Sequence, residues 1–216
     1  MATEFVSEAG RWYRADGTPC YTIIGTNGKE RATTLRDARK LSLLPSVTTI
    51  MGAARKPALE MWLEEQAYQS AFTTPTLPGE SYADWKRRVK DFAAEESTEA
   101  RDIGTTIHGA IECAYRGEPI RIEAMPQAHA AIECVAQNCG DQQWHPERSF
   151  ASGFGYAGRV DLHSGGWVID FKTKDIGEDK PPLYAEHFCQ LAAYRVGLGL
   201  PRARCAIVFV DRSRPL

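Results

Sequence analysis

Two aspartates and a lysine lie close together in the stretch 155–174, GYAGRVDLHSGGWVIDFKTK. Asp161 and Asp170 each sit in an apolar run, and a Gly-Gly pair between the runs is typical of two β-strands joined by a tight turn. Lys172 follows Asp170 by two residues and therefore points to the same face of its strand, because side chains alternate with period two. Two carboxylates held this way can bind a divalent cation, and a cation beside an ammonium group is what phosphodiester hydrolysis requires. The alternative is a surface hairpin with ordinary solvated charges, since so short a motif also occurs by chance.

The composition predicts one large globular domain, or one domain with an appended subdomain. The chain has 216 residues, of which 43% are hydrophobic, enough for a core that needs no disulfides. The net charge of −2 is unevenly distributed: residues 1–56 carry nine Lys/Arg against five Asp/Glu, residues 57–147 seven against sixteen, and residues 148–216 ten against seven. A polyanion could be bound by the basic ends with acids gathered around a metal, or the acidic middle could be a set of solvated helix faces.

Cysteine spacing and hydropathy predict a cytoplasmic protein. The six cysteines show no C-x-x-C pair and no zinc-type spacing, so we expect buried free thiols in a reducing compartment. Glu4 and Glu8 interrupt the N-terminus, and no signal peptide is expected. No apolar run approaches the roughly 18 residues of a membrane helix, so no membrane association is expected either.

The front of the chain is expected to be β-structure followed by a short helix. Residues 11–31 contain the turn dipeptides Asp16-Gly17 and Asn27-Gly28, and residues 33–40 read as a helix. Ser46 or Thr48 is expected to cap another short helix. Basic residues in this region form a candidate phosphate-contacting patch or, as an equal alternative, a solvated face: Arg31, Arg36, Arg39 and Lys40.

A helical region is expected to follow. Apolar spacing predicts one helix after Pro57, a second around Trp85, a third from about 95 to 115 and a fourth over 126–138. His108 lies beside the apolar stripe of the third helix, one turn from Glu112. A single histidine on a helix is more often a structural or exposed residue than a ligand.

The last third of the chain alternates between strand and helix patterns. Strands are predicted at 143–150, 154–164 and 166–173, a helix at 183–200, and a fully apolar strand at 205–210. From residue 95 onward, the resulting order is α(α)βββαβ. The first three strands should be antiparallel neighbours, and the helical crossover should place the last strand parallel to the third. We therefore predict an α/β fold with a mixed sheet.

Four motifs occur in order on these elements: GTTIH at 104–108, GRVD at 158–161, DFKT at 170–173 and QLAAY at 190–194. Together they resemble the RecB-type branch of the PD-(D/E)XK nucleases. The segment LPSVTTI also resembles the mitochondrial genome maintenance exonucleases and their phage and bacterial relatives. The resemblance covers about residues 44–210. It implies a restriction-endonuclease-like αβββαβ core with a mixed sheet, plus an N-terminal β-hairpin and a helical region. The expected segments are a hairpin with a basic extension at 1–43, a helical region with the His108 helix at 44–142, and the nuclease sheet core at 143–216.

The resemblance also implies roles for individual residues. Asp161 and Asp170 would be the carboxylate ligands of one or two Mg²⁺ or Mn²⁺ ions, with His108 and the backbone carbonyl of Phe171 as further ligands. An imidazole ligand favours Mn²⁺. Lys172 would orient or help deprotonate the attacking water. Glu147 is a further candidate metal ligand, because relatives often carry another acid at this place. The candidate DNA contacts are Gln190, Tyr194, Thr173, Lys174 and Ser46.

The implied activity is a metal-dependent DNA exonuclease that leaves 5′-phosphates in recombination, repair or replication. Its substrate would be linear DNA with free ends, including single strands, and an annealing or single-strand-binding protein is an expected partner. The four-cysteine pattern that holds an iron–sulfur cluster in some relatives is not present at matching positions, so no cluster is expected. Three alternatives stay open: a structure-specific endonuclease of the same fold, a non-catalytic DNA-end-binding module, and an unrelated metal-binding α/β protein.

Overall fold

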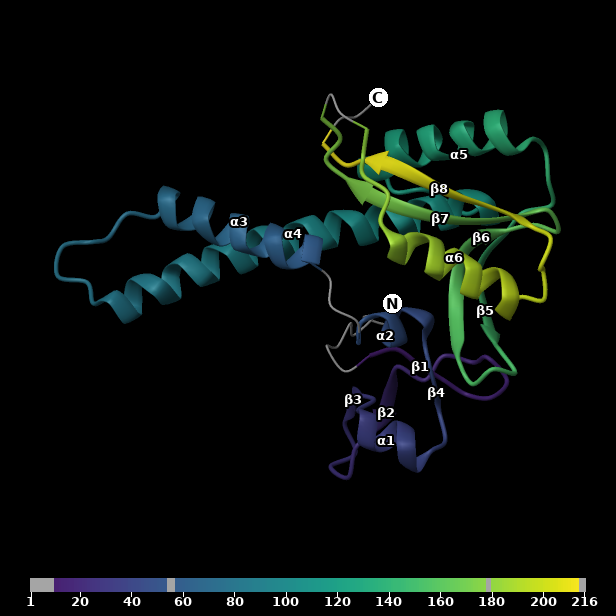
Figure 1. Ribbon diagram of the computed structural model, residues 1–216, viewed down its shortest axis with the longest axis horizontal. Helices are drawn as coiled ribbons and strands as arrows, with labels where there is room; N and C mark the ends of the chain where they lie inside the picture. Colours follow the sequence, from purple (N-terminus) through teal and green to yellow (C-terminus); the bar gives the residue numbers. More distant parts are fainter. Residues whose placement is uncertain (1–9, 54–56, 178–179, 214–216) are drawn as a thin grey trace. The chain divides into compact units, whose positions relative to one another are not determined.

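The computed structural model describes residues 10–53, 57–177 and 180–213 (Figure 1). The chain divides into two compact units, one formed by Met1–Ala53 with Ile107–Leu216 and the other by Ala54–Thr106. Within the described part of the chain, no helix combines the length and apolar character that crossing a membrane requires.

Short elements form the N-terminal part of the first unit. Their bounds are β1 Trp12–Tyr13, β2 Thr22–Ile24, β3 Glu30–Ala32, α1 Leu35–Lys40, β4 Leu44–Pro45 and α2 Val47–Met51. Strands β2 and β3 form the hairpin predicted around Asn27-Gly28. Gly28 has a φ of 72°, the left-handed conformation that glycine adopts without strain. Strand β1 instead pairs antiparallel with β4, more than thirty residues along the chain, so its partner could not be inferred from a local turn.

A four-stranded sheet forms the centre of the first unit. Its strands are β5 His145–Ala151, β6 Ala157–His163, β7 Trp167–Lys174 and β8 Arg204–Asp211, in the order β5-β6-β7-β8. The first two pairings are antiparallel and the third is parallel. Helix α6, Ala185–Gly197, connects the two parallel strands. The predicted mixed sheet and the parallel last strand are therefore confirmed.

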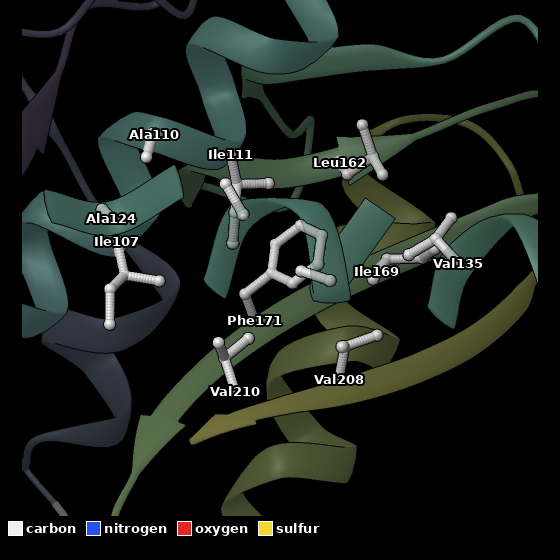
Figure 2. Close-up of a cluster of buried hydrophobic side chains, with 12 residues drawn as sticks. Ile107, Ala110, Ile111, Ala124, Val135, Leu162, Ile169, Phe171, Val208 and Val210 are labelled. Carbon is white, nitrogen blue, oxygen red and sulfur yellow. The ribbon is translucent and has the colours of Figure 1, made fainter. Parts of the chain in front are cut away.

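Helices cover both faces of this sheet, as Figure 1 shows for α5 and α6. On one face, the C-terminal end of helix α4, Tyr82–Arg116, and helix α5, Met125–Cys139, bury apolar side chains against β6, β7 and β8. Figure 2 shows Phe171 at the centre of this cluster, beside Ile111 and Val210. On the other face, α2 and α6 pack against β5, β6 and β7. Full burial of a large apolar side chain stabilises a fold by roughly 1.5–3 kcal/mol, so these two layers fix the sheet that carries the two aspartates.

The second unit consists of α3, Pro57–Thr73, the loop that follows it, and the first part of α4, Tyr82–Arg116. The loop is fastened by a hydrogen bond from Trp85 Nε1 to the Thr74 carbonyl (2.7 Å) and by an ion pair between Arg88 and Glu80 (2.8 Å). The prediction of two separate helices between 82 and 116 is wrong, because α4 is continuous. No glycine or proline occurs between Tyr82 and Ile103 to end the first helical segment.

All six cysteines lie in the described residues and are free thiols. The prediction that they are buried is wrong for half of them, since only Cys20 is buried outright and the exposed thiols are Cys134, Cys189 and Cys205. Of these exposed thiols, Cys189 lies on α6 and Cys205 lies on β8, an edge strand of the sheet.

Candidate active site

Strands β6 and β7 separate at the two aspartates. Their pairing register includes Leu162 with Ile169 and His163 with Val168, next to the turn, and goes no further. Beyond it, the backbone N–H of Phe171 donates a hydrogen bond to Oδ2 of Asp161 (2.8 Å). At this position, a side-chain carboxylate and not a backbone carbonyl accepts the hydrogen bond from the N–H of a central strand. Asp161 is consequently held at the point where the two strands part.

The partner strand β5 is distorted at the same level. Glu147 lies opposite Asp161 in the β5–β6 register, between the pairs Pro146 with Leu162 and Arg148 with Val160, and has a φ of 51°. A non-glycine residue in this left-handed region is strained by about 1–3 kcal/mol, and such strain is concentrated at functional sites. The Glu147 carboxylate forms an ion pair with Arg159 Nε (2.5 Å). Its role as a metal ligand stays a prediction.

Asp170 is the centre of a buried polar network. Lys172 Nζ lies 2.6 Å from its Oδ2, so the two side chains share a face of β7, as the alternation predicts. Gln190 Nε2 donates to Asp170 Oδ1 (2.8 Å) and to the Tyr194 hydroxyl (3.0 Å), while Gln190 Oε1 accepts from Lys172 (3.4 Å). Both N–H donors and the oxygen acceptor of the Gln190 amide are therefore used. The opposite orientation of the amide would turn its oxygen toward the Asp170 carboxylate. Gln190 therefore fixes Asp170 and Lys172 relative to each other.

Burial dominates the electrostatics of the two carboxylates. It raises the pKa of Asp170 to about 6, with the negative charge of Asp161 raising it further and Lys172 opposing both. Burial also raises the pKa of Asp161, against the hydrogen bond from Phe171 and the charge of Lys172. Two like charges held together away from water favour any added positive charge between them.

His108 reaches this group from α4. Its Nδ1 lies 3.6 Å from Asp161 Oδ2, too far for a hydrogen bond, and its ring meets the edge of Phe171 at a centroid distance of 6.4 Å. Burial lowers the pKa of His108, and Lys172 lowers it further, against the charge of Asp170. The imidazole is thus kept neutral near neutral pH, which is the form that binds metals.

The donor set fits a divalent cation in its chemistry. It offers two carboxylates, which have the single ammonium of Lys172 beside them, and one neutral imidazole, a set that suits Mg²⁺ or Mn²⁺. Among residues 10–53, 57–177 and 180–213, no three His, Cys, Asp or Glu side chains are grouped as metal ligands. Lys172 occupies Asp170 Oδ2 instead, so a cation would have to share that oxygen with the ammonium or displace it.

The predicted DNA contacts lie in different surroundings. Gln190 and Tyr194 are buried within the network described above. Lys174 lies on β7 beyond Lys172, with its ammonium 5.6 Å from the ring centroid of Tyr184, and Thr173 beside it is half-buried. Ser46 is 2% exposed, and its hydroxyl caps α2 by accepting the N–H of Thr49 (2.9 Å). The cap confirms one of the two predicted alternatives, and the DNA contacts stay predictions.

Arg11 is a site neighbour that sequence reasoning did not identify. Its charge acts on the pKa values of Asp161, His108 and Tyr194, although it is far from all three in sequence. No motif marks Arg11, because its position depends on the long-range pairing of β1 with β4. In the basic patch that the sequence did suggest, Arg31 is neutralised by Asp37, with a closest N–O distance of 2.7 Å.

Comparison of the chain with protein-family models found no match, and comparison with curated proteins found none either. A function therefore has to be argued from the site itself.

Proposed function

We propose that the chain is a metal-dependent DNA exonuclease of the PD-(D/E)XK type, which acts on linear DNA in recombination, repair or replication. One observation carries the proposal. Asp161, Asp170 and Lys172 meet where two central strands separate, and Gln190 and Tyr194 of the next helix complete a hydrogen-bond network around Asp170.

The order of elements around this site gives further support. Helices α4 and α5 precede three antiparallel strands, and α6 leads to a parallel fourth strand. This order agrees with the αβββαβ order expected of a restriction-endonuclease-like core, and the two acids lie on the second and third strands, β6 and β7. A hairpin with ordinary solvated charges would not bury Asp170 and leave Asp161 only partly exposed, or hold Asp170 between two polar partners, Lys172 and Gln190.

The residues divide the work as follows. Asp161, Asp170, His108 and the carbonyl of Phe171 would hold the divalent cation, which when bound neutralises phosphate charge and lowers the pKa of water. Lys172 is positioned by Asp170 and Gln190, so its ammonium can orient the attacking water and stabilise the negative charge that grows on the phosphate oxygens. The water gives up a proton to solvent and its oxygen bonds to phosphorus as the bond to the 3′ oxygen breaks; the 3′ oxygen takes up a proton from solvent, and the phosphate stays on the 5′ carbon.

A nuclease assay with matched variants tests the proposal. Labelled linear and circular DNA, single- and double-stranded, would be incubated with the protein in Mg²⁺, Mn²⁺ or EDTA, beside Asp170→Asn and Lys172→Ala. We expect degradation of linear DNA that needs a metal and is lost in both variants. Variants as active as the wild type would overturn the assignment of the site. Cleavage of circular DNA would overturn the dependence on ends and favour an endonuclease, and metal-independent binding without cleavage would favour an end-binding module.

A further inference from the structure

Arg11 is anchored through its backbone, while its side chain is exposed. Its N–H donates to Thr49 Oγ1 (2.9 Å), and its carbonyl accepts the N–H of Ser46 (2.9 Å). The two following residues, Trp12 and Tyr13, are buried at 6% and 1% exposure and hold the strand in place. The start of the Arg11 side chain is therefore fixed at the beginning of α2, and the residue as a whole is exposed.

This anchoring point adjoins the strand that carries Asp161. Ser46 forms a parallel bridge with Ala157 at the start of β6, and β1, β4 and α2 all contact β6. Helix α2 also packs on α6, which carries Gln190 and Tyr194. The segment that holds Arg11 thus lies next to both β6 and α6, the elements that carry Asp161, Gln190 and Tyr194.

The charge of Arg11 acts on three residues of the site. Burial raises the pKa of Asp161 and of Tyr194, and Arg11 is among the positive charges that oppose this. Burial lowers the pKa of His108, and Arg11 lowers it further. These three residues belong to β6, α6 and α4. Arg11 is thus an exposed positive charge within electrostatic range of residues on all three elements.

The guanidinium has its donors available. Within the described part of the chain, it forms no ion pair with a carboxylate, in contrast to Arg31 with Asp37 and Arg159 with Glu147. Its neighbour is the ring of Tyr21, whose centroid lies 5.8 Å from the Arg11 Cζ. Stacking on an aromatic face restrains an arginine side chain and leaves the N–H groups of its fork free for two phosphate oxygens.

We propose that Arg11 binds a phosphate group of the DNA strand that is held at the site. This inference rests on the proposed function. Asp161 and Asp170 repel a polyanion, so a strand can approach them only if positive charge lies along its path. An arginine fork with no carboxylate partner matches a phosphate better than any other group of DNA, because it can form two parallel charge-assisted hydrogen bonds. The phosphate is either one within the strand or a terminal one, and the two can be distinguished.

The test measures binding in EDTA, where no cleavage interferes. Fluorescence anisotropy would follow a labelled single-stranded oligonucleotide, with and without a 5′-phosphate, at several salt concentrations. We expect Arg11→Gln to weaken binding several-fold and to reduce the slope of log K against log salt by about 0.7–1, the contribution of one phosphate contact. Arg11→Lys should keep the salt slope and recover only part of the affinity, because an ammonium cannot form the paired contact.

Arg14→Gln is the matched control. Arg14 is an exposed arginine of the same segment, and its replacement by glutamine changes the net charge by the same amount. It should bind like the wild type. Equal weakening by Arg11→Gln on both oligonucleotides assigns a phosphate within the strand, and a loss confined to the phosphorylated one assigns the terminal phosphate. If the wild type binds DNA and the affinity of Arg11→Gln equals that of the wild type or of Arg14→Gln, the inference about Arg11 fails and the proposed function is unaffected. If the wild type does not bind DNA, the proposed function fails with it.

Discussion

Replacing Asp170 by asparagine should stabilise the metal-free protein at pH 8 while removing its activity. Burial and the charge of Asp161 raise the Asp170 pKa from 3.8 to about 6, a difference of about 2 units. Each unit corresponds to about 1.4 kcal/mol, so ionised Asp170 weakens the native state by roughly 3 kcal/mol at pH 8. Asparagine cannot ionise and can still accept the hydrogen bond from Gln190, although it loses the ion pair with Lys172. We expect a net gain of about 1–3 kcal/mol, and each kcal/mol raises the unfolding midpoint by about 2–4 °C for a chain of this size.

The dependence on pH identifies the cause. The native protein binds the Asp170 proton more tightly than the unfolded chain does, so the stability contribution of this proton is complete below pH 3.8 and is lost as the pH rises through about 6. The advantage of Asp170→Asn should therefore be large at pH 8 and close to zero near pH 4, in thermal unfolding followed in EDTA. Asp175→Asn is the control, because Arg212 lowers the pKa of that exposed carboxyl and its removal should bring no gain at pH 8. A variant that is less stable than the wild type at pH 8, or that shows the same difference at both pH values, would refute the reasoning.

Four further variants test other parts of the account. Lys172→Ala should lower DNA hydrolysis by about 10²–10³-fold in steady-state assays and leave DNA affinity within a few-fold. Burial lowers the pKa of His163, so the stability that its neutral form contributes is lost as the pH falls below 6.5, and the unfolding midpoint of His163→Phe should fall less between pH 8 and pH 5 than that of the wild type. Ser46→Ala removes the cap of α2 and should lower the free energy of unfolding by about 1 kcal/mol in denaturant titrations. Gly197→Ala places a methyl group against the ring of Phe150 and should cost about 1–3 kcal/mol, which Phe150→Leu should partly restore.

Local patterns predicted the elements of the sheet, because the strands alternate or are wholly apolar and glycine pairs mark the turns. The continuity of helix α4 is not evident from the apolar stripe, because the polar stretch 95–102 interrupts it, although no helix-breaking residue occurs between Tyr82 and Ile103. The left-handed backbone of Glu147 has no signature in the sequence, since glutamate rarely adopts this conformation and the surrounding sheet imposes it.

The residues of the candidate site also differ in how far the sequence predicts their positions. Asp161, Asp170 and Lys172 could be placed together because their strands are adjacent and side-chain alternation is regular. The network around Gln190 could be anticipated only as a shared helix face, since its hydrogen bonds depend on how α6 packs on the sheet. Arg11 could not be found at all, because the pairing that brings it to the site joins segments far apart in the chain.

The identity of the attacking group tests the central claim most directly. The protein would be incubated with linear DNA and Mn²⁺ in water enriched in oxygen-18, and the released nucleotides would be analysed by mass spectrometry, with Asp161→Asn alongside. We predict nucleoside 5′-phosphates that carry one oxygen-18 on phosphorus, and no release by the variant. Products without the label, release that continues in Asp161→Asn, or intact DNA with the wild-type protein would contradict a nuclease built on Asp161, Asp170 and Lys172.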